Sequence, residues 1–179
     1  MTRIAQADED AFRLLVRRYQ NLIYSTIVRM LGNYDFHEAE DLAQQVFIKV
    51  YRAAPRYRPT ARFTTWLLTI CRNCVFTHTK QRNRWKWELL NFDEESKTPP
   101  SAFIAEAQDD PFQRELANHI QLALNQLPEK QRLALVLRQY DHLDYEQIAE
   151  VLETSVSSVK SLLFRGRETL RAILKEYLA

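Results

Sequence analysis

The chain has 179 residues, of which 46% are hydrophobic, and this length allows either one domain or two small ones with buried cores. Only 2 glycines and 6 prolines leave little material for hairpins and bulges, so an all-α fold is favoured. No apolar run approaches the roughly 20 residues of a membrane span, and the N-terminus lacks a secretory signal pattern. The 2 cysteines suit a reducing compartment. These features together predict a cytoplasmic protein without membrane insertion.

The first long amphipathic helix is predicted between residues 12 and 31. Its apolar residues recur at helical spacing: Phe12, Leu15, Val16, Tyr19, Leu22, Ile23, Ile27, Met30 and Leu31. Gly32 and Asn33 then supply a stop, because both residues tolerate the left-handed backbone that ends a helix. A second helix is predicted from about Glu38 to Ala54, with acidic residues in its first turn and Pro55 just past its end.

A third helix supplies the face against which the first two pack. Its apolar stripe comprises Phe63, Trp66, Leu67, Ile70, Cys71, Cys74, Val75 and His78. Another face, left for solvent or a ligand, bears Thr69, Asn73, Thr77, Lys80 and Arg84. Cys71, Cys74 and His78 could be read as zinc or redox ligands, but closed zinc sites use four ligands and core packing explains these three, so we predict no metal and no cofactor.

Charge is segregated along the chain, although the formal net charge is only +2. The stretch between Leu42 and Trp87 contains no acidic residue. Its basic residues are Lys49, Arg52, Arg56, Arg58, Arg62, Arg72, Lys80, Arg82, Arg84 and Lys86. Such a block predicts a polyanionic partner. Trp85 and Trp87 lie within it and could either stack on bases or fasten the end of the third helix.

The next segment reverses the sign of the charge and marks a boundary. Between Glu88 and Glu115 acidic residues outnumber basic ones, and a proline pair at residues 99–100 opposes regular structure. We therefore predict two small helical domains, residues 1–88 and 111–179, joined by a flexible acidic linker over residues 89–110.

Four short helices are predicted in the C-terminal half. The first carries the apolar residues Phe112, Leu116, Ile120, Ala123 and Leu127. Pro128 suits the first position of the second helix, where its missing N–H costs nothing. The third helix begins with a capping box, in which Asp144 and Gln147 can each satisfy an unpaired backbone donor.

The segment Tyr145–Arg167 has the spacing of a helix-turn-helix. The turn is Glu153-Thr154-Ser155, where Ser155 can cap the second helix and Glu153 stands in place of the glycine often found there. Val159 anchors the second helix against the first. The remaining face is free to enter a major groove of DNA and bears Ser157, Lys160, Ser161, Phe164, Arg165 and Arg167, although Phe164 could equally belong to the core.

The chain as a whole resembles the extracytoplasmic-function (ECF) group of the sigma-70 family. Three ordered stretches are similar to the family's region 2: FRLLVRRYQNLIYSTIVRML, EAEDLAQQVFIKVYRA and FTTWLLTICRNCVFTHTKQR. A fourth is similar to region 4: LPEKQRLALVLRQYDHLDYEQIAEVLETSVSSVKSLLFRGRETLRAIL. The resemblance covers about residues 8–175. It implies a non-enzymatic alternative sigma factor that directs bacterial RNA polymerase to promoters, with a region 2 helical bundle and a region 4 helix-turn-helix.

The resemblance also implies a role for each surface. The second region 2 helix of the family binds the clamp helices of the largest polymerase subunit, and the matching residues are Asp41, Gln44 and Gln45. The minus-10 element is bound as a melted strand, at positions that match Tyr57, Arg58, Arg62, Asn73, Thr77 and Lys80. The minus-35 duplex is read by the exposed face of the recognition helix. The implied partners are core RNA polymerase, through its clamp helices and flap, promoter DNA and an anti-sigma factor.

Two other classes of function remain open from the residues alone. A helix-turn-helix regulator that binds duplex DNA without polymerase would leave Asp41, Gln44 and the loop around Tyr57 with no common purpose. An enzyme is disfavoured, because the sequence has no carboxylate cluster with histidine at ligand spacing, no glycine-rich phosphate loop and no nucleophile motif.

Overall fold

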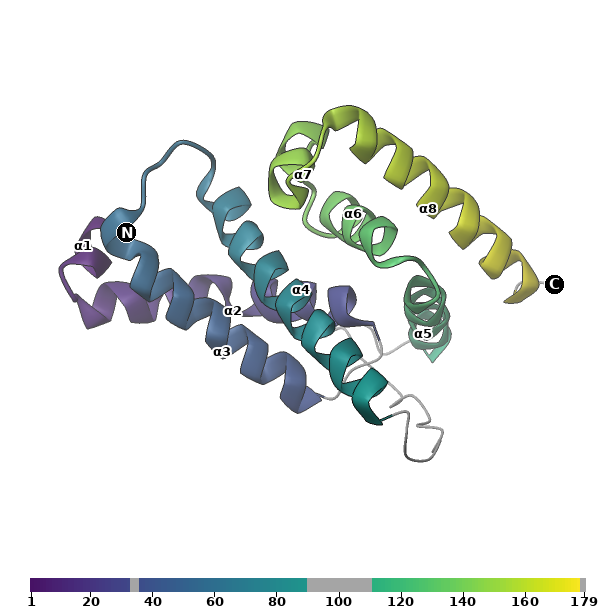
Figure 1. Ribbon diagram of the computed structural model, residues 1–179, viewed down its shortest axis with the longest axis horizontal. Helices are drawn as coiled ribbons and strands as arrows, with labels where there is room; N and C mark the ends of the chain where they lie inside the picture. Colours follow the sequence, from purple (N-terminus) through teal and green to yellow (C-terminus); the bar gives the residue numbers. More distant parts are fainter. Residues whose placement is uncertain (33–35, 90–110, 178–179) are drawn as a thin grey trace.

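The computed structural model describes residues 1–32, 36–89 and 111–177, and the regular structure of these residues is entirely helical. The N-terminal half contains α1 (Thr2–Ala5), α2 (Glu9–Leu31), α3 (Phe36–Ala53), the short 3-10 helix η1 (Ala54–Arg56) and α4 (Phe63–Leu89). The C-terminal half contains α5 (Pro111–Asn125), α6 (Glu129–Gln139), α7 (Tyr145–Leu152) and α8 (Val156–Tyr177). The two halves lie side by side, with the chain termini at opposite ends of the molecule (Figure 1).

The predicted all-α fold with two helical domains is confirmed. Most of the predicted linker, residues 90–110, lies outside the described residues, and the exact limits of the domains stay a prediction. Among the residues described, none of the helices combines the length and the apolar character that crossing a bilayer requires.

The N-terminal half is a bundle of α2, α3 and α4, which contact one another in all three pairs. The predicted stripes meet in its core, where Ile27, Leu42 and Leu67 are fully buried. Asp8 caps the N-terminus of α2, because its Oδ1 accepts a hydrogen bond from the Ala11 N–H at 2.9 Å. Gly32 ends the helix with a φ of 77°, as the sequence predicted. Helix α1 was not predicted, since four residues are too few to show a periodicity.

The C-terminal half differs from prediction in two details. Pro128 precedes the first residue of α6 instead of occupying it. Helix α8 has 22 residues and is not short, because its C-terminal part continues beyond the helix-turn-helix to pack against α5 and α6. The close approach of α8 to α6 depends on Gly166, where a Cβ atom would lie 2.8 Å from Cδ1 of Leu135.

The two halves share one continuous cluster of buried side chains, in which α7 packs against α4 and α6 against α2. Polar bonds cross this seam. Thr26 Oγ1 is bonded to Asp141 Oδ1 at 2.9 Å, and Arg132 Nε donates to the Met30 carbonyl at 2.9 Å. Arg132 is buried, and among the described residues it is the only charged one that is; burial lowers the pKa of its guanidinium. The seam therefore contains bonded polar groups as well as apolar surface.

Gly32 has a second role at this seam. A Cβ atom on this residue would lie 3.0 Å from Oδ1 of Asn125 and 3.3 Å from a terminal nitrogen of Arg132. The glycine thus ends α2 and also admits two side chains of the C-terminal half close to the end of that helix.

Asp141 should make the stability of the folded chain depend on pH. Burial raises the pKa of Asp141 to about 6. The hydrogen bond from Thr26 and the charges of Arg29 and His142 lower this pKa by smaller amounts. The Cys71 thiol lies near the same carboxyl group. The ordinary pKa of the group is 3.8, so the folded chain binds more protons than the unfolded chain between about pH 4 and pH 6. The contribution of this group to the free energy of unfolding is therefore fully present below about pH 4 and is lost as the pH rises through 6.

We expect Asp141→Asn to raise the melting temperature at pH 7.5 and to have little effect near pH 4, since asparagine keeps an acceptor for Thr26 but cannot ionise. The gain in free energy of unfolding is bounded at about 3 kcal/mol, at about 1.4 kcal/mol per pKa unit. Calorimetric melts across this pH range measure it, with the exposed Asp10→Asn as control. A melting temperature below that of the wild type at pH 7.5 would contradict the account.

Gly166→Ala should destabilise the chain even though alanine is the better helix former. Overpacking against Leu135 costs about 1 to 3 kcal/mol, and the middle of this range, about 2 kcal/mol, exceeds the gain of up to about 1 kcal/mol in helix propensity. Urea unfolding measures the difference. Leu135→Ala in the same chain should relieve the clash, so the double variant should lose less stability than the sum of the two single variants. Additive losses would show that the two residues do not collide.

Candidate nucleic-acid interface

The predicted helix-turn-helix is formed by α7, residues 153–155 and α8. Its capping box is present, because the Gln147 N–H donates to Asp144 Oδ1 at 2.8 Å and the Asp144 N–H donates to Gln147 Oε1 at 2.9 Å. Ser155 caps α8 as predicted, since its Oγ accepts from the Ser158 N–H at 3.2 Å. Glu153 adopts the left-handed conformation with a φ of 52°, so the turn has the geometry that a glycine usually provides.

The outer face of α8 has the composition of a DNA-reading surface. Val159 and Leu163 are buried against the rest of the half and fix the rotation of the helix. All six predicted residues are exposed: Ser157, Lys160, Ser161, Phe164, Arg165 and Arg167. Phe164 is 67% exposed, which decides against its assignment to the core. No acidic residue occurs in α8 before Glu168, so residues 156–167 contribute cations to the exposed face and no carboxylate.

A cluster of aromatic rings supports the loop between η1 and α4. The Tyr57 ring is half-buried and lies edge-on to the Trp66 ring, with 4.8 Å between the two ring centroids. The centroid of the Phe63 ring lies 6.0 Å from that of Tyr57. Arg58 and Arg62 extend from the same loop and are exposed. The loop therefore presents two cations beside an aromatic side chain whose position is held by the bundle.

The predicted minus-10 residues on α4 also share an exposed face. Asn73, Thr77 and Lys80 are all exposed. The Thr77 hydroxyl donates to the Asn73 backbone carbonyl at 2.8 Å, so its oxygen remains as an acceptor. Asn73 presents an amide, which can both donate to and accept from the edge of an unstacked base.

Helix α3 presents a third exposed surface. Asp41, Gln44 and Gln45 all face solvent, as expected for contact residues. Two apolar neighbours that were not predicted, Ile48 and Tyr51, are 48% and 39% exposed. Ile48 lies seven residues after Asp41, or about two helical turns, so both residues are on the same side of α3. The signal was present in the sequence, because Ile48 is apolar but falls outside the buried stripe of this helix.

The basic block is not uniformly available for nucleic acid. Arg72 is paired with Glu153 at 2.7 Å, and Arg82 is paired with Glu38 at 3.5 Å. Both partners lie outside the block in the sequence, so the local charge pattern could not reveal them. The side chains of Trp85 and Trp87, for which the sequence allows either stacking on bases or fastening of the helix end, lie outside the described part of the molecule, as does that of Lys86.

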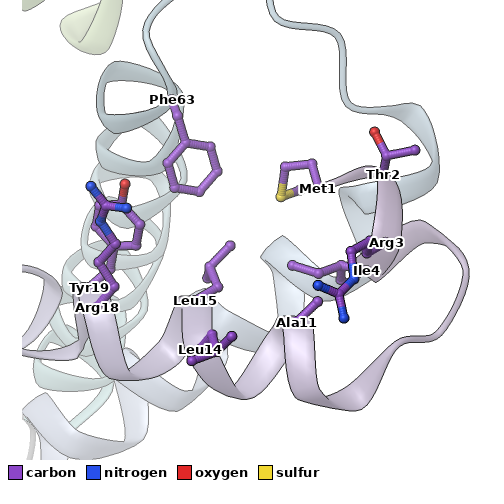
Figure 2. A pocket seen from close by; sticks show the side chains of 10 residues that line it. All are labelled: Met1, Thr2, Arg3, Ile4, Ala11, Leu14, Leu15, Arg18, Tyr19 and Phe63. Carbon is purple, nitrogen blue, oxygen red and sulfur yellow. The ribbon is translucent and has the colours of Figure 1, made fainter.

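An open groove of about 440 Å³ lies at the end of the bundle, between α1, α2 and the first residue of α4. Phe63, Met1 and Leu15 surround it, and Arg3 and Arg18 lie at its margin (Figure 2). This groove was not predicted from the sequence, because its walls come from segments that are separated along the chain.

Cys71 and Cys74 belong to the core of the bundle, where they are 0% and 2% exposed. Burial is the main cause that raises the pKa of both thiols, which disfavours the thiolate that a metal would bind. His78, the third candidate, is half-buried on the same helix. Among the described residues, no group of three histidine, cysteine or acidic side chains is arranged to hold a metal ion.

Comparison with known proteins places both halves in one family. Residues 15–85 match the family described as Sigma-70 region 2, and residues 118–170 match Sigma-70, region 4. The RNA polymerase sigma-H factor of Pseudomonas aeruginosa is 35% identical over 98% of this chain and 92% of its own length. The ECF RNA polymerase sigma factor SigW of Bacillus subtilis is 34% identical over 97% of this chain and 94% of its own length.

A solved structure has a similar fold. It contains the sigma factor RpoE of Bartonella quintana in complex with the anti-sigma factor NepR. The TM-score is 0.73 at 22% sequence identity, with 92% of this chain and 97% of that chain covered.

Proposed function

Because this chain belongs to the ECF group of the sigma-70 family, we propose that its two halves recognise the two elements of a promoter separately. Members of this family are transcription initiation factors that direct RNA polymerase, and they are not enzymes. The N-terminal half reads the melted minus-10 strand, and the C-terminal half reads the minus-35 duplex. The observation that carries the proposal is the pair of exposed polar and cationic helix faces, one on α4 and one on α8.

The chemistry of the α8 face suits duplex DNA. The Arg165 guanidinium can hold two acceptors of a guanine edge or a phosphate, whereas the Lys160 ammonium acts mainly as a point charge. The exposed Phe164 can contact the methyl group of a thymine. Ser157 and Ser161 add hydroxyl groups that can bond to either phosphates or bases.

The chemistry of the loop and of α4 suits a single strand. Arg58, Arg62 and Lys80 can neutralise phosphates, and the Asn73 amide can bond to the edge of an extruded base. Tyr57 can contribute an aromatic surface against which a base stacks. Trp66 and Phe63 hold the Tyr57 ring in place, so less conformational entropy is lost when a base binds there.

We further propose that the outer face of α3 binds the clamp helices of the polymerase. Asp41, Gln44 and Gln45 would provide polar contacts, while Ile48 would add apolar area that is otherwise unfavourably exposed. The second half would lie near the polymerase flap. These contacts would place the protein in the cytoplasm, where transcription occurs.

An anti-sigma factor is the remaining proposed partner. The Bartonella quintana sigma factor was solved in complex with such a protein, and the ECF membership of this chain supports a partner of the same class. No metal or cofactor is needed for any of these contacts, which depend on hydrogen bonds, charge and apolar area.

Transcription from paired promoters tests whether the two halves read different promoter elements. We expect Asn73→Ala to reduce open-complex formation with sensitivity to a change at one minus-10 base, because it removes a base-edge contact. We expect Arg165→Ala to cost roughly 1 to 3 kcal/mol at the minus-35 element. Each variant holoenzyme is measured on promoters that differ by one base in one element. If Asn73→Ala responds only to minus-35 changes, or Arg165→Ala only to minus-10 changes, the two assignments are wrong.

Binding to core polymerase tests the role of α3. The double variant Asp41→Ala, Gln44→Ala should weaken affinity for core enzyme at least about tenfold, because truncating a central hot-spot residue of an interface costs about 2 kcal/mol or more and tenfold corresponds to about 1.4 kcal/mol. Fluorescence anisotropy with purified core measures the affinity. The matched control is Glu9→Ala, Gln20→Ala, which removes an exposed acid and an exposed amide from α2. Equal losses in the two double variants would argue against a specific role for α3.

A further inference from the structure

Another cavity lies where α4 meets the C-terminal half, and the proposed function gives it no role. Its volume is about 290 Å³, and it is less open to solvent than the groove at the end of the bundle. Its apolar wall combines Phe76 of α4 with one leucine from each of α6, α7 and α8: Leu133, Leu152 and Leu162. We call this cavity the α4 pocket. Because its wall comes from four separate helices, no local sequence pattern predicts it.

Three charged side chains also line the α4 pocket. Arg72 and Lys130 are cationic and Glu153 is anionic, so the lining carries one net positive charge. Lys130 is exposed and lies in the first turn of α6, where the positive end of the helix dipole adds to the potential. A ligand with a single negative charge would therefore complement the pocket, whereas a cation would be repelled.

Arg72 has hydrogen-bonding capacity that the protein does not use. Its Nε donates to the Val151 carbonyl at 2.8 Å. Its Nη2 is buried and lies 2.7 Å from Glu153 Oε1, but without the geometry of a hydrogen bond. Its Nη1 makes no hydrogen bond to any residue that the structure describes. A guanidinium whose side chain is only 11% exposed thus keeps unpaired N–H groups in the pocket wall, and a carboxylate is an acceptor that matches their fork geometry.

The size of the α4 pocket limits the ligand. An apolar cavity of about 150 Å³ is enough to hold benzene, so about 290 Å³ admits an aromatic ring or a short alkyl chain with a carboxylate attached. This volume lies at the lower end of the range for small-molecule sites, which begins at about 300 Å³. A peptide segment or a nucleotide would exceed it.

We propose that the α4 pocket is a binding site for a small organic monocarboxylate with an apolar body. The carboxylate lies between Arg72 and Lys130, and the Thr154 hydroxyl, which also lines the pocket, is a further donor. The apolar body covers Phe76, whose side chain is otherwise 43% exposed. The site goes beyond promoter recognition, because none of these residues belongs to the proposed polymerase, minus-10 or minus-35 contacts.

The groove at the end of the bundle suits such a ligand less well. It is more open to solvent, so it would bury less of the apolar body. Arg3 at its margin is already paired with Asp8, at 2.7 Å between Nε and Oδ2. The leucines of this groove, Leu14 and Leu15, therefore provide an internal comparison for the α4 pocket.

Titration of the full chain with sodium benzoate tests the proposal, with methyl-labelled leucines observed by NMR. We expect the methyl signals of Leu133, Leu152 and Leu162 to shift along one saturation curve, with a dissociation constant on the order of 1 mM. Benzamide has nearly the same shape but no charge. It should bind at least about fivefold more weakly, because hydrogen bonds to an ionised acceptor are roughly twice as strong as those between neutral groups.

Variants separate the charged part of the pocket from the apolar part. Lys130→Gln should weaken benzoate binding about threefold, since an exposed cation contributes modestly. Phe76→Ala should weaken it at least about fivefold, because it removes the aromatic wall. The matched control Lys175→Gln removes an exposed lysine near the far end of α8 and should leave the affinity unchanged. Melting temperatures without benzoate verify that each variant is folded.

Several results would overturn the inference. One is the absence of a saturable shift at the three leucines of the α4 pocket, and another is a shift confined to Leu14 and Leu15. Equal affinities for benzoate and benzamide would show that the pocket does not recognise a carboxylate. A folded Phe76→Ala variant with wild-type affinity would place the ligand elsewhere. The titration involves neither polymerase nor DNA, so its outcome is independent of whether the proposed promoter recognition is correct.

Discussion

Helix α4 is packed on two sides, and this double burial constrains the rest of the molecule. One side, with Leu67 and Cys71, completes the bundle with α2 and α3. Another side contacts α7 across the seam, and Arg72 lies on it. Only the remaining strip, with Asn73 and Thr77, is left for solvent and for a nucleic acid. A helix has little circumference to divide among three such surfaces, so the candidate minus-10 surface is necessarily adjacent to the contact between the halves.

Arginine has two different uses in this chain. On α8 and in the loop before α4 arginine is exposed, and its charge there can bind the phosphates of a nucleic acid. At the seam, Arg72 and Arg132 bond to backbone carbonyls near helix ends, where the guanidinium satisfies groups that helical structure leaves unpaired. The planar guanidinium tolerates such partly buried positions better than an ammonium, because it is more weakly hydrated and can bond to several acceptors. The number of cations in the basic block therefore overstates the positive charge that is available for DNA in the N-terminal half.

The only two glycines of the chain lie at close approaches between elements, each with a distinct physical reason. Gly166 lets α8 cross α6 near Leu135, which fixes the position of the recognition helix within its half. Gly32 has a positive φ and also makes room for Asn125 and Arg132 from the other half. The first serves packing within one domain and the second serves packing between domains. In both cases a missing Cβ allows a contact that any other residue would obstruct.

The sequence by itself determined all the described helices except α1 and η1, their buried faces, the capping box at Asp144 and the helix-turn-helix, because each depends on residues within a few positions of one another. It also identified exposed faces on α4 and α8, since a face outside the apolar stripe of a helix must point away from the core, whereas Asp41, Gln44 and Gln45 on α3 came from the resemblance to the family. Only the tertiary structure decided that Arg72 is engaged by the other half, that the half-buried Asp141 lies against Thr26 and that Tyr57 is held by Trp66. The bonds across the seam join residues 79, 102 and 115 positions apart. Local periodicity contains no information about such pairs, because they form only when two separately folded surfaces meet.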